Sequence, residues 1–251
     1  MKMVINYVIM LLVILMIEIK NLHKFYGKKE ILKGINLTIN DGDIYAFVGS
    51  NGAGKTTTIK AMLGILPFEN GDVLYDGKSI KEEPLEIKEN LAYIPDNPDI
   101  YEHLTGLEYL SFIADMYETD AKTKNENIKK YSKLLEIDTK LNDKIGSYSH
   151  GMRQKIVIIA ALVHNPKVII MDEPFVGLDP LSTHTLKDIM KELTKEGKII
   201  FFSTHVLDVA EKLCNKIAII KNGKILTEGT MKEVTKNSSL EDIFLELVSH
   251  E

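Results

Sequence analysis

An α/β fold built around a mainly parallel sheet core is predicted by two observations: the placement of apolar runs and the helical patterns between them. Near-continuous apolar runs are typical of strands that are covered on both faces. Helix-like periodicity separates these runs, as in residues 56–66 and 181–196, which indicates alternating strands and helices. The apolar runs occupy residues 44–48, 167–171, 199–203 and 218–220.

The first part of the chain differs from this alternation and predicts an N-terminal antiparallel β subdomain. IEIKNL and ILKGINLTIN read as strands, and the turn residues Asp41 and Gly42 follow them. Residues 72–78 add a strand that ends in an Asp-Gly turn. Because strands joined by tight turns pair antiparallel, we expect a small antiparallel sheet beside the parallel core.

The middle of the chain predicts an inserted α-helical subdomain at about residues 97–165. This region carries helical pattern and charge but little strand signal. Within it, residues 122–133 are rich in lysine and polar side chains, which is typical of a solvated helix face or loop. Residues 238–251 read as a further helix, either a dimer contact or a packed terminus.

Residues 1–15 form an apolar N-terminal extension ahead of the main domain, which we place at residues 16–251. The apolar run is too short to cross a bilayer comfortably, since a span needs about 20 residues. No small-residue cleavage site of a signal peptide follows it. Three interpretations stay open: an interfacial anchor, a short membrane-inserted tail, or a start site assigned too early. Met16 directly precedes IEIKNLHKFYG, a sensible domain beginning, which favours the early start.

Composition and charge exclude several classes of protein. The chain has 251 residues, of which 45% are apolar and 27% charged, as in ordinary globular proteins. Its net charge is −5 and no basic stripe stands out, so no nucleic-acid partner is expected. Cys214 is the only cysteine, which excludes a disulfide framework and indicates a reducing compartment. We therefore expect the chain to lie in or face the cytoplasm.

The stretch GSNGAGKT matches the phosphate-loop pattern G-x-x-x-x-G-K-[ST] at every defined position. It follows an apolar strand and opens a helical pattern, which is the context that this loop needs. Glycines let backbone amides surround a phosphate, Lys55 can reach the β- and γ-phosphates, and the Thr56 hydroxyl can bind Mg²⁺. A glycine-rich surface turn is the weaker alternative. The sequence thus predicts a P-loop NTPase whose nucleotide contacts are Gly49, Ser50, Asn51, Gly52, Ala53, Gly54, Lys55 and Thr56.

An acidic pair, Asp172 and Glu173, ends the apolar run in VIIMDEP. In open α/β sheets, ligands bind where strands end, at the carboxyl edge. One carboxylate can hold Mg²⁺ and its neighbour can accept a proton from an attacking water. The alternative is an acidic helix start before Pro174. Next to a phosphate loop, the pair indicates a hydrolytic site.

Further motifs stand in a distinctive order. Tyr26 precedes GSNGAGKTT, YSHGMRQ (148–154) precedes VIIMDEP, and GLDP (177–180) and STH (203–205) follow. With these motifs the chain, from Met16 onward, resembles the nucleotide-binding subunit of an ATP-binding cassette (ABC) transporter. In that family the motifs are an adenine-stacking aromatic, Walker A, the signature, Walker B, the D-loop and the switch histidine. The short length, YSHGM and an acidic Q-loop resemble exporter-type or ABC-2-type systems.

The resemblance implies hydrolysis of ATP, with Mg²⁺, at two composite sites in a head-to-tail dimer. On this basis Tyr26 stacks on adenine and Thr57 supports the α-phosphate. Thr56 and Asp172 complete the metal site. Glu173 polarises the attacking water as the catalytic base.

Contacts between the two subunits are implied for the signature, the D-loop and the switch histidine. The Ser149 hydroxyl and the Gly151 amide of one subunit approach the γ-phosphate held by the other. His205 bridges that phosphate and the opposite D-loop, where Asp179 connects the two sites. Ser149 is also a preferred helix N-cap residue. His150 replaces a glycine of the family's LSGGQ and is either a solvent-facing spacer or a pH-sensitive contact.

The Q-loop is the main departure from the family pattern, because Asp96 stands where a glutamine is usual. An ionised aspartate only accepts hydrogen bonds, whereas glutamine also donates. Either Asp96 approaches Mg²⁺ through water, or Asn97 takes the contact and Asp96 caps a turn. Beyond the Q-loop, Tyr101, His103 and Leu104 either line the groove for a membrane partner or form a simple helix-start cluster.

The expected function is ATP hydrolysis that powers transport through a separate integral membrane permease. The expected partners are that permease and a second ABC ATPase subunit, in a homodimer or a heterodimer. The expected location is peripheral, at the cytoplasmic face of the cell membrane. The alternative is a soluble ABC ATPase that acts on ribosomes or DNA, although tandem cassettes and basic extensions are missing from the sequence. An ordinary kinase or GTPase would leave the signature, D-loop and switch histidine unexplained.

Overall fold

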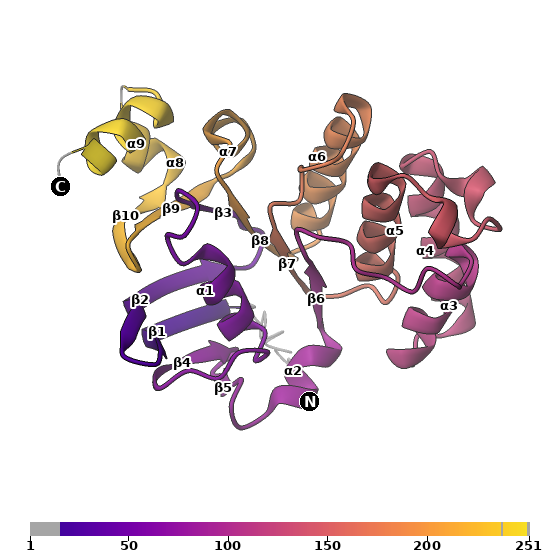
Figure 1. Ribbon diagram of the computed structural model, residues 1–251, viewed down its shortest axis with the longest axis horizontal. Helices are drawn as coiled ribbons and strands as arrows, with labels where there is room; N and C mark the ends of the chain where they lie inside the picture. The colour runs from indigo at the N-terminus through magenta and orange to yellow at the C-terminus, as the bar shows by residue number, and fades with distance from the viewer. Residues whose placement is uncertain (1–15, 237, 250–251) are drawn as a thin grey trace, which may run out of the picture.

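The computed structural model describes residues 16–236 and 238–249 of the chain, so the apolar extension 1–15 lies outside the described residues. Two sheets form the body of the molecule, and helices lie beside them (Figure 1). This is the predicted α/β arrangement, with an N-terminal antiparallel sheet next to a mainly parallel one.

The larger sheet has six strands in the order β10-β9-β3-β8-β7-β6. Neighbours pair in parallel from β9 to β6, and only β10 runs antiparallel. Strands β3, β7 and β8 are buried along their whole length, as their apolar runs predict. The strands are β3 (Ile44–Val48), β6 (Leu91–Ile94), β7 (Val168–Asp172), β8 (Ile199–Thr204), β9 (Lys216–Lys221) and β10 (Lys224–Thr230).

The smaller, antiparallel sheet has the order β2-β1-β4-β5. Its buried side chains form one apolar core with Tyr45, Phe47 and Phe201 of the larger sheet and with helix α1 (Lys55–Met62). The sequence predicted a longer helix, over residues 56–66. Helix α1 ends at Met62, because Gly64 soon after it takes a left-handed φ of 59°. The strands are β1 (Met16–Tyr26), β2 (Lys29–Asn40), β4 (Asn70–Tyr75) and β5 (Lys78–Ser79), and α2 (Pro84–Glu89) follows.

Three α-helices gather at one end of the molecule, beyond β6 (Figure 1). They are α3 (Gly106–Met116), α4 (Ala121–Leu134) and α5 (His150–Leu162), with the short 3-10 helices η1 (Asp138–Lys140) and η2 (Ile145–Ser147) before α5. Buried residues of all three join the core beneath the sheet. The expected limits of the insertion, 97 and 165, stay a prediction.

The remaining helices cover the larger sheet and close the chain. Leu240 of the last helix is fully buried, and its backbone N–H donates to Glu211 Oε2 at 3.1 Å. Within residues 16–236 and 238–249, no helix combines the length and apolarity needed to cross a bilayer. These helices are α6 (Pro180–Lys195), α7 (Leu207–Leu213), α8 (Met231–Thr235) and α9 (Leu240–Ser249).

Candidate nucleotide site

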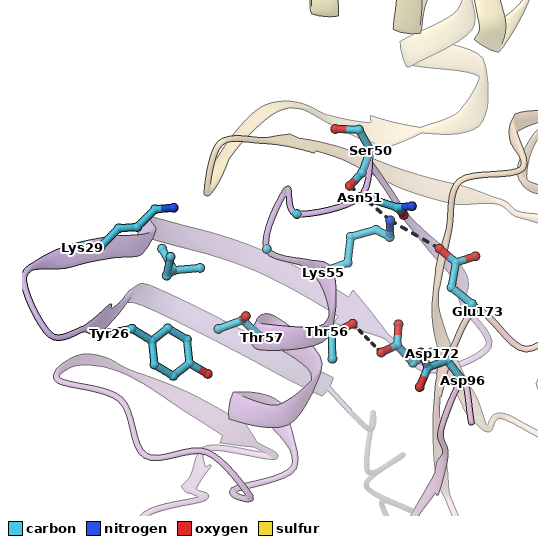
Figure 2. A pocket seen from close by; sticks show the side chains of 13 residues that line it. Tyr26, Lys29, Ser50, Asn51, Lys55, Thr56, Thr57, Asp96, Asp172 and Glu173 are labelled. Carbon is cyan, nitrogen blue, oxygen red and sulfur yellow. Dashed lines mark hydrogen bonds and ion pairs between the residues drawn. The ribbon is translucent and has the colours of Figure 1, made fainter. Parts of the chain in front are cut away.

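A hollow of about 430 Å³ opens where β3 and β7 end, between the two sheets (Figure 2). Most of the nucleotide and metal contacts expected from the sequence come together there. Lys29 and Ile31 also line it, and the sequence interpretation missed both. The strand alternation of β2 places these two on one side, which is the signal that could have found them. The other lining residues are Tyr26, Ser50, Asn51, Gly52, Gly54, Lys55, Thr56, Thr57, Asp96, Asp172 and Glu173.

The phosphate loop links β3 to α1 and folds around the ammonium group of Lys55. Lys55 Nζ donates to the Gly49 carbonyl at 2.7 Å and is almost fully buried. Gly49 is required by packing, because a Cβ there would lie 2.5 Å from the Ile220 carbonyl oxygen. Gly54 has a φ of 114°, a conformation that side-chain-bearing residues rarely adopt. The loop therefore presents backbone amides and one cation at the start of a helix, which suits a phosphate.

Asp172, the last residue of β7, is buried and accepts hydrogen bonds at both oxygens. Thr56 Oγ1 donates to Asp172 Oδ2 at 2.6 Å, and Ser203 Oγ of β8 donates to Oδ1. Ser203 lies on the neighbouring strand, as the last residue of the run 199–203, and its role was missed from the sequence. The three side chains form a fixed group of hard oxygen atoms beside the phosphate loop.

Glu173 has its carboxylate held between a lysine and a histidine. Lys55 Nζ lies 3.3 Å from Glu173 Oε1, and His205 Nδ1 lies 3.0 Å from Oε2. The backbone N–H of Glu173 donates to Ser203 Oγ at 3.1 Å. Glu173 also has a left-handed φ of 47°, a strained state that tends to occur at functional sites. The carboxylate of Glu173 thus lines the hollow, and contacts with Lys55, His205 and Ser203 fix the position of the residue.

Tyr26 lies at the other end of the hollow, at the end of β1, with half of its surface exposed. Lys24 Nζ sits 5.4 Å from the centre of its ring and is itself paired with Glu69 at 2.8 Å. Thr57, on the first turn of α1, faces the same space (Figure 2). An exposed aromatic ring at the end of the hollow opposite the phosphate loop can stack on a base.

Asp96 lines the hollow near Asp172, whereas Asn97 is not among the lining residues described. Burial raises the pKa of Tyr93, and the charges of Asp172 and Asp96 raise it further. The carboxylate of Asp96 therefore belongs to the acidic wall of the site. Asp96 thus lies at the hollow and Asn97 does not line it, while a contact of Asp96 with a metal through water stays a prediction.

Six predicted site residues do not line the hollow. Gly49 and Ala53 belong to the phosphate loop and His205 contacts Glu173, whereas Ser149, Gly151 and Asp179 lie at the N-termini of α5 and α6. Ser149 is the N-cap of α5, as expected, and accepts a hydrogen bond from the Met152 N–H at 3.3 Å. Asp179 is the N-cap of α6 and accepts from the Ser182 N–H at 2.8 Å. Ser149, Gly151 and Asp179 form a second group, which does not line the hollow of the same chain.

An exposed aromatic surface follows the Q-loop. Tyr101 is 53% exposed, and its ring centre lies 6.1 Å from that of Phe112 on α3 and 5.9 Å from that of His103. The same segment leads into a capping box, in which Thr105 and Glu108 satisfy the first amides of α3. The segment is therefore both a helix start and an apolar surface open to solvent.

Comparison with known proteins places this site in one family. Residues 32–176 match the family model described as ABC transporter. The ATP-binding protein EcsA of Bacillus subtilis (strain 168) is 33% identical over 241 residues, covering 94% of this chain and 98% of EcsA. The linearmycin resistance ATP-binding protein LnrL of the same organism is 35% identical, covering 87% of this chain and 70% of LnrL.

Solved structures agree with the sequence relatives. The structure described as an ATP-binding subunit of an ABC transporter superposes with a TM-score of 0.89 at 32% identity, covering 93% of this chain and 99% of that chain. The stretch that matches the family model, residues 32–176, includes the phosphate loop and the acidic pair, and the fold agrees with it. The chain belongs to the ATP-binding subunits of ABC transporters and is an ATPase.

Proposed function

We propose that the chain binds ATP and Mg²⁺ in the hollow, pairs head to tail with a second ABC ATPase subunit, and powers a separate integral membrane permease. In this role it lies at the cytoplasmic face of the membrane, as a peripheral subunit. The observation that carries the proposal is the division of the predicted contacts into two groups. One group lines the hollow, and the other, with Ser149 and Gly151, does not.

The phosphate loop and Lys55 bind the triphosphate. Lys55 Nζ has only carbonyl oxygens and Glu173 Oε1 as partners among the contacts described, so it can turn to phosphate oxygens with little rearrangement. Backbone amides at the N-terminus of α1 add the favourable end of the helix dipole. Tyr26 stacks on adenine, and Thr57 supports the α-phosphate.

Thr56 and Asp172 fit a magnesium site. Their oxygens lie 2.6 Å apart, and Mg²⁺ is bound in such enzymes by one or two protein oxygens together with phosphates and water. Among the described residues, no cluster of three or more His, Cys, Asp and Glu side chains could hold a metal ion. When bound, Mg²⁺ neutralises charge on the phosphate oxygens. Ser203 keeps the second oxygen of Asp172 oriented.

Glu173 is the base for the attacking water. Its carboxylate accepts the proton of a water molecule placed in line with the γ-phosphate. His205 keeps Oε2 oriented through its Nδ1. It directly follows β8 and is half-exposed, so an incoming subunit can reach it.

The second group of residues completes the site of a partner subunit. Ser149 and Gly151 lie at the N-terminus of α5, where an anion is favoured, yet they are absent from the hollow of their own chain. A phosphate held by the neighbouring subunit fits this position. Asp179 lies in the same group and faces the same partner. The chain's own geometry thus supports a head-to-tail pair.

The aromatic surface at Tyr101 and Phe112 suits an apolar helix of the permease, since both side chains are exposed next to the Q-loop. A resistance protein, LnrL, is among the relatives, which fits an exporter-type or ABC-2-type system. Action on ribosomes or DNA is less well supported, because the descriptions of the matching family, of EcsA and of the similar solved structure all name a transporter.

Purification of the chain from its native membranes in mild detergent, followed by mass spectrometry, tests this proposal. A polytopic membrane protein in stoichiometric amount is the expected result. A Tyr101→Glu variant should lose that protein and keep ATP binding, because the substitution places a charge on the docking surface only. Recovery of the wild type with ribosomal or nucleic-acid partners instead would contradict the transport assignment.

A further inference from the structure

The signature segment and the D-loop touch within one chain. Gly177, in the loop between β7 and α6, has a φ of 81°, and a Cβ there would lie 2.4 Å from His150 Cδ2. A Cβ on Gly151 would lie 3.0 Å from the Gly177 carbonyl oxygen. The imidazole ring therefore occupies the space that Gly177 leaves free. This contact gives His150, where the family has a glycine, a role that depends on the shape of the ring.

A second contact joins the same two segments. Lys155 Nζ lies 3.4 Å from Asp179 Oδ2, and the lysine side chain is only 12% exposed. Hydrogen bonds from Ser182 hold the pKa of Asp179 down to about 2, so the carboxylate is ionised at neutral pH. Burial of a charged ammonium group is unfavourable unless the group is paired. The ion pair with Asp179 offsets this cost.

The D-loop also connects to the nucleotide site of its own chain. Gly177 lies four residues after Glu173, whose carboxylate faces the hollow and contacts Lys55 and His205. The backbone between them is short, with the Val176 N–H donating to the Glu173 carbonyl at 3.1 Å. A displacement of the D-loop therefore moves the segment that carries the base.

We infer that His150 and Lys155 are positioning residues that tie the signature to the D-loop, so that the partner's γ-phosphate, bound at Ser149 and Gly151, sets the position of Glu173. We call this pair of contacts, His150 with Gly177 and Lys155 with Asp179, the signature clamp. The inference rests on the proposed head-to-tail pairing. It makes the signature clamp the link between the two ATP sites of a dimer.

The test uses the full chain with Glu173→Gln, mixed with ATP, and analytical ultracentrifugation to follow the dimer. His150→Gly and Lys155→Met should each raise the ATP concentration for half-maximal dimer formation about fivefold, equivalent to about 1 kcal/mol. Binding of a fluorescent ATP analogue to the monomer should not change. The variants His150→Phe and Lys155→Arg keep the ring or the charge and should restore most of the affinity.

Steady-state kinetics separate positioning from a general loss of structure. In the chain with Glu173 intact, His150→Gly and Lys155→Met should lower the Hill coefficient for ATP toward 1. A role limited to stability would lower the active fraction and leave the Hill coefficient unchanged.

Gly177→Ala offers an independent test with a matched control. It inserts a Cβ against the His150 ring, whereas Gly197→Ala has the same φ of 81° with nothing within 4 Å. Gly177→Ala should weaken dimer formation strongly, Gly197→Ala should not, and His150→Gly should reduce the additional effect of Gly177→Ala.

Two outcomes have distinct meanings. If Glu173→Gln alone stays monomeric with ATP, head-to-tail pairing of this chain is contradicted and the signature clamp inference falls with it. If Glu173→Gln dimerises and the His150 and Lys155 variants behave identically to it, only the signature clamp inference is overturned.

Discussion

His164 is expected to make the protein less stable as the pH falls from 7 to 5. It follows α5, and its ring stacks on Tyr117 with the centres 3.7 Å apart and the planes 10° apart. Burial lowers the pKa of His164 to about 4, and the positive charge of Lys198 lowers it further. The unfolded chain takes up a proton at about pH 6.5, and the folded chain resists it until about pH 4. Between these values the unfolded state binds more protons, so stability decreases as the pH falls.

The size of the effect follows from the two pKa values. When the pH falls from 7 to 5, protonation of His164 in the unfolded state lowers the free energy of unfolding by about 2 kcal/mol. For a chain of this length, about 2 kcal/mol corresponds to a change of roughly 4 to 8 °C in Tm.

Thermal unfolding of the wild type, His164→Phe and His164→Gln at pH 7 and pH 5 measures this contribution. Both variants are uncharged at position 164, so their Tm difference between the two pH values should be smaller than that of the wild type by about 4 to 8 °C. His184→Gln, on an exposed face of α6, is the matched control and should keep the wild-type difference. Equal pH differences in the wild type and both His164 variants would refute the reasoning.

Two further substitutions test the ends of the nucleotide site. Tyr26→Ala should raise the KM for ATP about tenfold with little change in kcat, because stacking on a base contributes roughly 1–3 kcal/mol, and Tyr26→Trp should keep the wild-type KM. An unchanged KM in Tyr26→Ala would exclude the stacking role. Ser203→Ala should lower kcat by about 10- to 100-fold at saturating ATP, because it removes a hydrogen bond to the Asp172 carboxylate that is worth roughly 1.5–3 kcal/mol. A normal kcat at saturating ATP would show that Asp172 needs no such support.

Local pattern was enough to predict the fold and the phosphate loop. The apolar runs correctly indicated strands covered on both faces, because burial on two sides leaves no polar alternation. The helix after the loop ended earlier than expected, at Met62, since periodicity continues past the point where Gly64 turns the backbone.

Contacts between distant segments were harder to predict. Ser203 bonds to Asp172 only because β8 lies beside β7, and strand order is a tertiary property. The fit of His150 against Gly177 likewise depends on how α5 packs beside the D-loop. From the sequence alone, His150 was compatible with a spacer or a pH-sensitive contact, and its neighbour across the fold was not visible.

The most direct test of the central claim is the rate of ATP hydrolysis by Glu173→Gln beside the wild type, measured together with ATP binding. The account predicts that turnover falls by a factor of about 100 or more while ATP binding is kept, since amide for carboxylate removes the base without changing the shape of the side chain. Under the same conditions an ATP-bound dimer should accumulate. Turnover close to that of the wild type would contradict Glu173 as the base and with it the proposed mechanism.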